Sequence, residues 1–206
     1  MYDSIIFDLD GTLWDAVDNI LISWNKVLEN NNKLKITKPQ LSACMGLKMD
    51  LIAEKLFPDL DRKSQIALME KCSDYELKYL AEHGARLYDG IEETINTLSK
   101  THKLFICSNC QKGYIECFLG CYKLGQYFTD TECWGNTGLS KGENISLLIK
   151  RNNLKSPVYV GDTQGDKDAA YEAEIPFVFA AYGFGKTDEY DYKVHSIKEL
   201  PHVIIN

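Results

Sequence analysis

The sequence lacks a long hydrophobic run, a basic leader and a small-residue cleavage site at its amino terminus, where Met1-Tyr2-Asp3-Ser4 leads directly into a short apolar stretch. We therefore expect a cytoplasmic protein without a membrane segment. The chain is also short of positive charge, with 23 Lys and Arg against 30 Asp and Glu and a formal net charge of -7. This balance disfavours a general attraction to nucleic acid or anionic lipid.

The cysteines do not form the pattern of a secreted disulfide framework. There are seven of them, an odd number, and they are scattered along the chain, so we expect reduced thiols. Cys107 and Cys110 have the spacing of a redox or zinc pair, but no second metal-binding pair stands at a suitable interval. The four histidines are equally scattered and lack a matched nucleophile or ligand partner. These observations argue against thiol, zinc and histidine chemistry.

The chain does have enough apolar residues for a core. With 206 residues and 45% hydrophobic composition, it suits one domain of ordinary size or a core with an insertion. Short apolar runs alternate with segments of helical periodicity, which predicts an α/β fold with a doubly wound, largely parallel sheet. The expected strands are 4–7, 103–107, 157–160 and 177–180, and helical spacing recurs around Ile91, Ile95 and Leu98 and around Ile145, Leu148 and Ile149.

The stretch from Asp15 to about Leu87 departs from this alternation. Apolar residues such as Ile20 and Trp24 stand at helical spacing, and we find no convincing strand. We interpret residues 15–87 as an inserted helical subdomain, with 1–14 and 88–206 forming the α/β core.

Polar residues follow three of the expected strands at the point where each strand ends. They are Asp8, Ser108 and Asp162. Ligands bind at the carboxyl ends of the strands in an open parallel sheet, so these residues should converge on one pocket. The loop from Asp8 to Thr12 adds a second carboxylate at Asp10, a flexible glycine and a hydroxyl, and could hold phosphate and metal together.

Other candidate residues have plain structural interpretations as well. Ser108-Asn109 could offer a hydroxyl and backbone amides to phosphate, or could cap a helix. Lys141 could neutralise phosphate, or could be a solvated surface lysine. Asp162 and Asp166 could favour Mg²⁺, or could cap the next helix.

In order along the chain, these residues resemble the four motifs of the haloacid dehalogenase superfamily. The matching segments are Asp8-x-Asp10-Gly11-Thr12, Ser108, Lys141 and Gly161-Asp162-x-x-x-Asp166. The resemblance covers essentially the whole chain, and the 15–87 insertion is similar to the helical cap of that family. Tyr182-Gly183-Phe184-Gly185 resembles a late loop of phosphoglycolate-phosphatase-like members. The resemblance implies a Rossmann-like core and a cap that closes over substrate.

The resemblance also implies a function: a Mg²⁺-dependent phosphatase for a small phosphorylated metabolite, with phosphoglycolate as the first guess. Asp8 would attack the phosphorus and form an aspartyl-phosphate, and Asp10 would protonate the leaving oxygen and later activate water. Mg²⁺ would lie between Asp8, the Asp10 carbonyl and Asp162. Asp166 would bind the metal through water or orient Lys141.

Phosphate binding is carried over from the same resemblance. Thr12, Ser108 and the Asn109 amide would hold phosphate oxygens, and Lys141 would offset the charge of phosphate and Asp8. Two other functions stay open: a phosphomutase that returns phosphoryl to a sugar, and a non-enzymatic phospho-acceptor or phosphate-responsive module. The insertion and Asp10 argue against the module. The sequence leaves the physiological substrate and the oligomeric state open.

Overall fold

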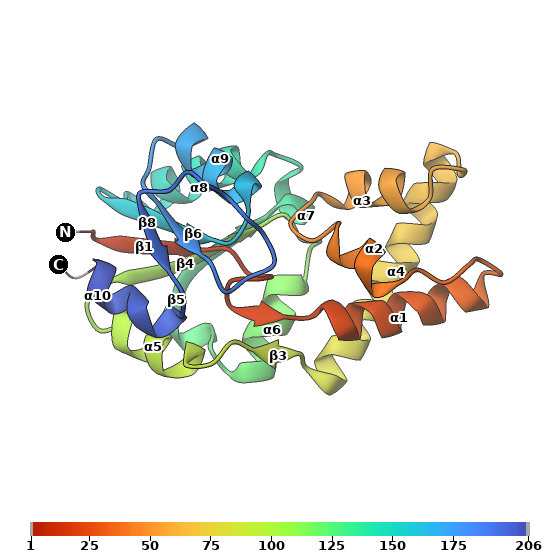
Figure 1. The fold of residues 1–206 in the computed structure, drawn as a ribbon, viewed down its shortest axis with the longest axis horizontal. Helices are drawn as coiled ribbons and strands as arrows, with labels where there is room; N and C mark the ends of the chain where they lie inside the picture. The colour runs from red at the N-terminus through yellow and green to blue at the C-terminus, as the bar shows by residue number, and fades with distance from the viewer. Residues whose placement is uncertain (1, 205–206) are drawn as a thin grey trace.

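The computed structural model describes residues 2–204, and in them a six-stranded sheet lies between two layers of helices (Figure 1). The strand order is β5-β4-β1-β6-β7-β8, and every neighbouring pair is parallel. The prediction of a doubly wound α/β fold is confirmed. The strands are β1 (Ser4–Phe7), β4 (Lys103–Ser108), β5 (Phe128–Cys133), β6 (Pro157–Gly161), β7 (Phe177–Ala180) and β8 (Tyr192–Val194).

Two strands of this sheet were missed from the sequence, and both lie at its edges. β5 has the sequence Phe-Thr-Asp-Thr-Glu-Cys, which contains no apolar run, and the strand is only partly buried. β8 is three residues long and two of them are exposed. Edge strands pack on fewer neighbours than central ones, and their sequences therefore carry a weaker pattern.

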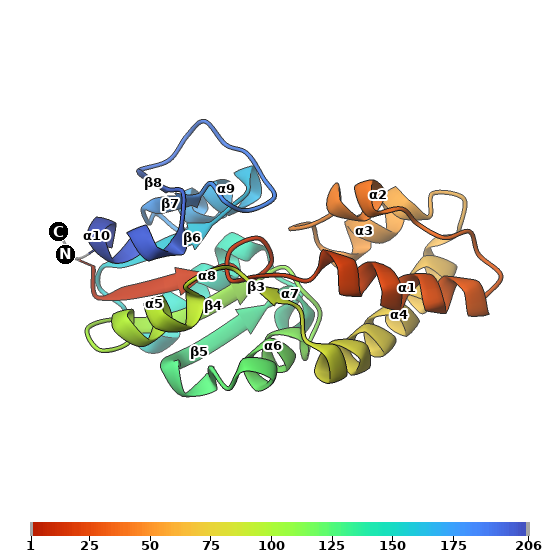
Figure 2. The same ribbon diagram turned by 60° about the horizontal axis from the view of Figure 1, so that its bottom comes forward.

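The two faces of the sheet are covered by different helices (Figure 2). Alternate residues of β1 point to opposite faces, so Ile5 and Phe7 join one apolar cluster and Ile6 joins the other. One face packs against α8 (Lys141–Asn152) and α9 (Gln164–Glu172); the other packs against α5 (Ile91–Leu98), α6 (Tyr114–Tyr122) and α10 (Leu200–Ile204). Within residues 2–204, no helix has both the length and the apolar character needed to cross a membrane.

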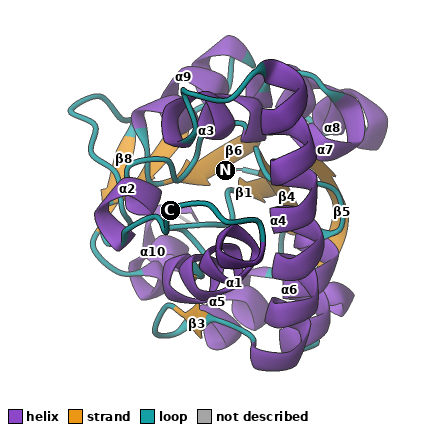
Figure 3. Cartoon of the chain, turned by 90° about the vertical axis from the view of Figure 1, so that its right-hand side faces the viewer, coloured by secondary structure: helices purple, strands orange, loops and turns teal. Residues whose placement is uncertain are grey.

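The inserted segment forms a group of helices beyond the carboxyl ends of the strands (Figures 1 and 3). The buried side of α1 includes Ile20 and Trp24, and α1 packs against the long helix α4. Pro39 lies in the first turn of α2, where its missing N–H costs nothing. The helices are α1 (Val17–Asn30), α2 (Lys38–Ser42), α3 (Met49–Leu56) and α4 (Arg62–His83).

The two ends of the inserted segment meet in a short antiparallel ribbon. β2 (Trp14–Asp15) pairs with β3 (Arg86–Leu87). The expectation of no strand between Asp15 and Leu87 was therefore wrong at these ends, because a two-residue strand is too short to leave a periodic pattern. The remaining elements are α7 (Trp134–Thr137) and 3₁₀ turns at Gly125–Tyr127 and Ile197–Glu199.

Candidate active site

A buried lysine links two carboxylates at the carboxyl edge of the sheet. Lys141 Nζ lies 2.9 Å from Asp8 Oδ1 and 2.5 Å from Asp166 Oδ1, and all three side chains are buried. Burial and the Asp166 charge raise the pKa of Asp8 to about 6, although Lys141 opposes this. Burial alone would lower the pKa of Lys141, but the two carboxylates outweigh it and raise that pKa above its usual value. The solvated-lysine interpretation of Lys141 is therefore wrong.

Asp166 uses its second oxygen to begin helix α9. Its Oδ2 accepts from the backbone amides of Asp162, at 3.1 Å, and Thr163, at 2.9 Å, and from the Thr163 hydroxyl at 2.7 Å. Thr163 is the N-cap of α9 and accepts from the Asp166 amide in return. Asp166 thus caps a helix and pairs with Lys141 at the same time.

The loop after β7 donates backbone hydrogen bonds to one carboxylate oxygen of Asp162. The backbone amides of Phe184 and Gly185 donate to Asp162 Oδ2 at 2.6 and 3.1 Å. The buried Oδ1 has no hydrogen-bond partner in the described part of the chain. Burial, with the Asp166 and Asp8 charges, raises the pKa of Asp162 to about 8.

This cluster of acidic groups fits a divalent cation. Carboxylate oxygens of Asp8, Asp162 and Asp166 lie within 4.8 Å of one another, and all three residues are buried. Lys141 supplies the cluster with one ammonium, which pairs with Asp8 and Asp166, and Asp162 Oδ1 is unpaired among the described residues. Mg²⁺ prefers oxygen ligands of this kind, so the residues present suit it.

Gly11 allows the first loop to approach this cluster closely. Its φ of +85° lies in the left-handed region, and a Cβ at this position would overlap the Asp162 carboxylate. A side chain here would therefore be strained and would also displace Asp162.

Asp10 turns toward a small cavity next to Asp8. Its Oδ1 accepts a hydrogen bond of 2.8 Å from the Tyr114 hydroxyl, which comes from the first turn of α6. Desolvation beside the cavity raises the pKa of Asp10 well above its usual value, and the hydrogen bond from Tyr114 opposes that shift. The second carboxylate of the loop is therefore held apart from the Lys141 cluster.

The expected phosphate-binding residues do not all line the cavity. Ser108 and Asn109 line the cavity with Asp8 and Asp10. The Asn109 side chain also donates to the Gly46 carbonyl at 2.9 Å, which joins the core to the inserted segment. The Thr12 hydroxyl is buried and has no partner among residues 2–204, and Thr12 does not line the cavity.

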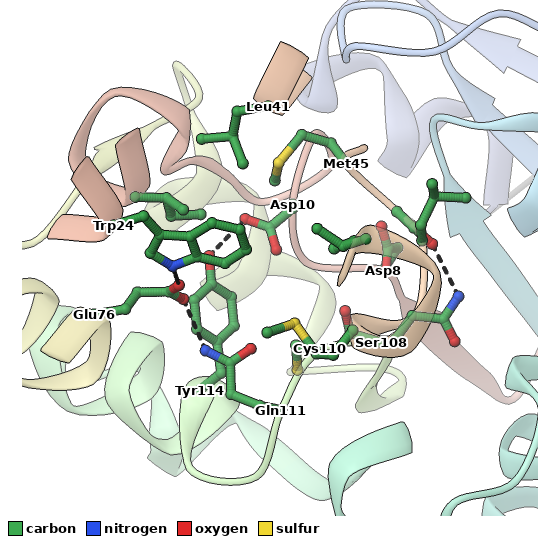
Figure 4. A pocket seen from close by; sticks show the side chains of 16 residues that line it. Asp8, Asp10, Trp24, Leu41, Met45, Glu76, Ser108, Cys110, Gln111 and Tyr114 are labelled. Carbon is green, nitrogen blue, oxygen red and sulfur yellow. Dashed lines mark hydrogen bonds between the residues drawn. The ribbon is translucent and has the colours of Figure 1, made fainter. Parts of the chain in front are cut away.

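The cavity lies between the sheet edge and the inserted helices (Figure 4). Its volume is about 40 Å³, enough for one or a few waters. The inserted segment supplies a mostly apolar wall: Ile20, Trp24, Leu41, Met45, Gly46, Leu47, Met49 and Ile52, with Glu76 as the exception.

Glu76 of α4 is a cavity residue that sequence reasoning missed. Its carboxylate accepts one hydrogen bond from Trp24 Nε1 and another, of 2.8 Å, from Gln111 Nε2. Burial raises its pKa to about 7 despite these two donors. A signal was available, because Glu76 stands at helical spacing between the buried Cys72 and Leu80. A glutamate on the apolar face of a helix marks either a buried partner or a ligand.

Tyr114 and Gln111 were also missed. They follow Ser108 closely in the sequence, yet no periodic pattern shows that one reaches Asp10 and the other Glu76. The directions in which these two side chains point depend on the residue at which helix α6 begins.

A family model described as haloacid dehalogenase-like hydrolase matches residues 5–180. A phosphoglycolate phosphatase of Xanthomonas campestris is 27% identical over 209 residues, covering 96% of this chain and 92% of its own length.

The fold is also similar to that of solved structures. A predicted phosphatase from Clostridium acetobutylicum has a TM-score of 0.84 at 23% identity, covering 100% of this chain and 99% of its own. A β-phosphoglucomutase from Clostridium difficile has a TM-score of 0.80 at 17% identity, covering 100% of this chain and 96% of its own.

Proposed function

The chain belongs to the haloacid dehalogenase-like hydrolase family, and on that premise we propose that it is a Mg²⁺-dependent phosphoric monoester hydrolase acting on a small phosphorylated metabolite. The observation that carries the proposal is the buried arrangement of Asp8, Lys141 and Asp166 at the edge of a cavity. This arrangement presents a carboxylate nucleophile and a fixed positive charge to an incoming phosphate.

Asp8 is the proposed nucleophile. It lines the cavity, and Lys141 pairs with its Oδ1, so the second carboxylate oxygen can attack phosphorus. The P–O bond to the alcohol breaks as the bond to Asp8 forms, which gives an aspartyl-phosphate. Lys141 offsets charge on both groups and is itself held in place by Asp166.

Asp10 is the proposed general acid and base. Enclosure raises its pKa, which favours the protonated form that can donate to the leaving oxygen. The carboxylate formed in that step can then take a proton from the water that hydrolyses the aspartyl-phosphate. Tyr114 keeps the side chain oriented through both steps.

Ser108, the Asn109 amide and Thr12 are the proposed phosphate-binding groups, together with Lys141. Ser108 and Asn109 line the cavity, and the Thr12 hydroxyl is buried with no hydrogen-bond partner among residues 2–204. Each carries an N–H or O–H that would donate to phosphate oxygens.

Asp8, the Asp10 carbonyl and Asp162 are the proposed Mg²⁺ ligands. Asp166 would contribute through a bound water, because both of its oxygens are already hydrogen-bonded. When bound, Mg²⁺ would neutralise the charge that develops on the transferring phosphoryl group.

Helices α1–α4 are the proposed cap, formed by residues 15–87 over a core of 1–14 and 88–206. The ribbon of β2 and β3 would be the connection about which the cap moves, and the hydrogen bond from Asn109 to Gly46 joins the two parts at the cavity. Closure would exclude water while Asp8 reacts.

A panel of small phosphate esters assayed for phosphate release with Mg²⁺ tests the proposal. The names of relatives such as the Xanthomonas campestris protein make phosphoglycolate the first ester to include. Turnover abolished by Asp8→Asn and by a chelator is the expected result. Transfer of phosphoryl to a second sugar position would instead indicate a phosphomutase, and a long-lived phospho-Asp8 without turnover would indicate a phospho-acceptor module.

A further inference from the structure

We infer that Glu76 selects the leaving group: the site takes phosphomonoesters whose small organic part carries a hydrogen-bond donor, a hydroxyl or an ammonium, and disfavours those that carry a carboxylate. This inference rests on the proposed phosphatase function and names its substrate class.

Glu76 faces the same cavity as the proposed nucleophile and acid (Figure 4). The residue is 2% exposed, and it comes from α4 of the proposed cap, across the cavity from Asp8. A phosphate group on Asp8 would therefore direct its organic part across the cavity toward this carboxylate.

The two hydrogen bonds of Glu76 hold it as an acceptor. Trp24 donates to one oxygen and Gln111 to the other, so neither bond requires a proton on Glu76. A carboxylate has about four acceptor positions, and these donors occupy one on each oxygen. The remaining acceptor positions of Glu76 can take a hydrogen bond from a ligand donor.

Among the described residues, no cationic side chain lines the cavity to balance a second anionic group. Sixteen of the described residues line it, and none of them is Lys, Arg or His. Lys141 does not line the cavity and is already paired with Asp8 and Asp166. A ligand carboxylate would lose its water beside Glu76 and gain no cationic partner there, and burying an unpaired charge is costly.

The remaining wall limits the size of the organic part. Side chains such as Ile20, Leu41 and Ile52 are apolar, and the cavity is small. The small volume favours a short carbon chain, and a donor at its far end would face Glu76.

Four esters of matched two-carbon size separate these chemistries: hydroxyethyl, aminoethyl and ethyl phosphate, and phosphoglycolate. We would measure kcat/KM for each with Mg²⁺ at about pH 8, where Glu76 is mainly ionised. The hydroxyethyl and aminoethyl esters should exceed both others by about tenfold or more, the effect of one hydrogen bond to a charged group. A kcat/KM for phosphoglycolate that equals or exceeds these values would overturn the inference, even without a variant.

Glu76→Gln then tests whether this residue sets the ranking. The ratio of hydroxyethyl phosphate to phosphoglycolate should fall by about tenfold, and a ratio measured within one preparation does not depend on how much protein is folded. Glu82→Gln is the matched control, an exposed glutamate on the same helix, and it should leave the ratio unchanged. An unchanged ratio in Glu76→Gln would overturn the inference alone. No turnover with any ester, an aryl phosphate included, would overturn the proposed function and the inference with it.

Discussion

The Tyr114 hydroxyl lies 2.8 Å from Asp10 Oδ1 and ties the first turn of α6 to the loop that follows β1. The Tyr114 ring is itself packed edge-on against Trp14, with centroids 5.4 Å apart, so the hydroxyl has little freedom to move. Residues 104 positions apart in the chain thus define where the proposed acid points. Tyr114 is a positioning residue for Asp10.

Tyr114→Phe should lower kcat for alkyl phosphates by about tenfold with little change in KM, because the hydroxyl orients Asp10 and does not bind substrate. The loss should be smaller for an aryl phosphate, whose leaving group needs less protonation. Kinetics on one alkyl and one aryl ester measure this difference. Tyr122→Phe, which removes a hydroxyl bonded to the Ala85 carbonyl, is the control and should affect both esters alike. Equal losses in Tyr114→Phe would contradict the assignment.

The sequence predicted those parts of the site that depend on strand ends. Asp8, Ser108 and Asp162 each follow a buried apolar run, and parallel strands must bring such positions to one edge. The sequence around Lys141 did not predict its burial, because that burial depends on how α8 packs against one face of the sheet. Only the order of the motifs singled it out.

The cavity wall could not be predicted in the same way. Glu76 and Trp24 meet because α1 and α4 pack together, and helical periodicity shows which face of each helix is buried but not which partner it meets. The Gln111 and Tyr114 side chains depend on the exact start of α6, and helix boundaries are the least certain part of a sequence prediction. Identifying the cavity-facing residues therefore required the tertiary structure.

Mg²⁺ should stabilise the folded chain, because it relieves the repulsion among Asp8, Asp162 and Asp166. At about 100 times the dissociation constant, the gain corresponds to a rise in Tm of roughly 5 °C or more. Thermal unfolding with Mg²⁺ and with a chelator measures it without relying on activity. Asp162→Asn should lose most of the rise. A Tm that does not respond to Mg²⁺ in the native chain would exclude the proposed metal site.

Glu76 should make the chain less stable as pH rises from its ordinary pKa of 4.5 to about 7. Its folded-state pKa is raised, so Glu76 ionises in the unfolded state at a lower pH than in the folded state. The contribution of Glu76 to stability is therefore fully present below pH 4.5 and is lost as the pH rises to about 7. Across this pH range, the free energy of unfolding should fall by on the order of 3 kcal/mol through Glu76 alone.

Denaturant unfolding of native chain and Glu76→Gln at both ends of this range measures the effect. Other buried carboxylates titrate in both proteins, so the difference between the two pH dependences isolates Glu76. Gln111 can rotate its amide to meet the new side chain, which limits the cost of the change. Identical pH dependences would show that Glu76 titrates as it does in the unfolded chain.

Gly11→Ala should abolish most activity and lower the free energy of unfolding by at least about 1–2 kcal/mol, the cost of placing a side chain in the left-handed region. Here the backbone has φ +85°, and the new Cβ would also overlap the Asp162 carboxylate, so the strain falls on a proposed metal ligand.

Gly120→Ala is the matched control for Gly11→Ala. Gly120 lies within α6, does not have positive φ, and has open space where the new methyl group would stand. That change should stabilise the chain by about 0.5–1 kcal/mol through helix propensity. Unfolding midpoints and phosphate release for both variants distinguish strain at the site from the general effect of adding a methyl group. Full activity in Gly11→Ala would mean that Asp162 can move away without loss, and would count against its role as a ligand.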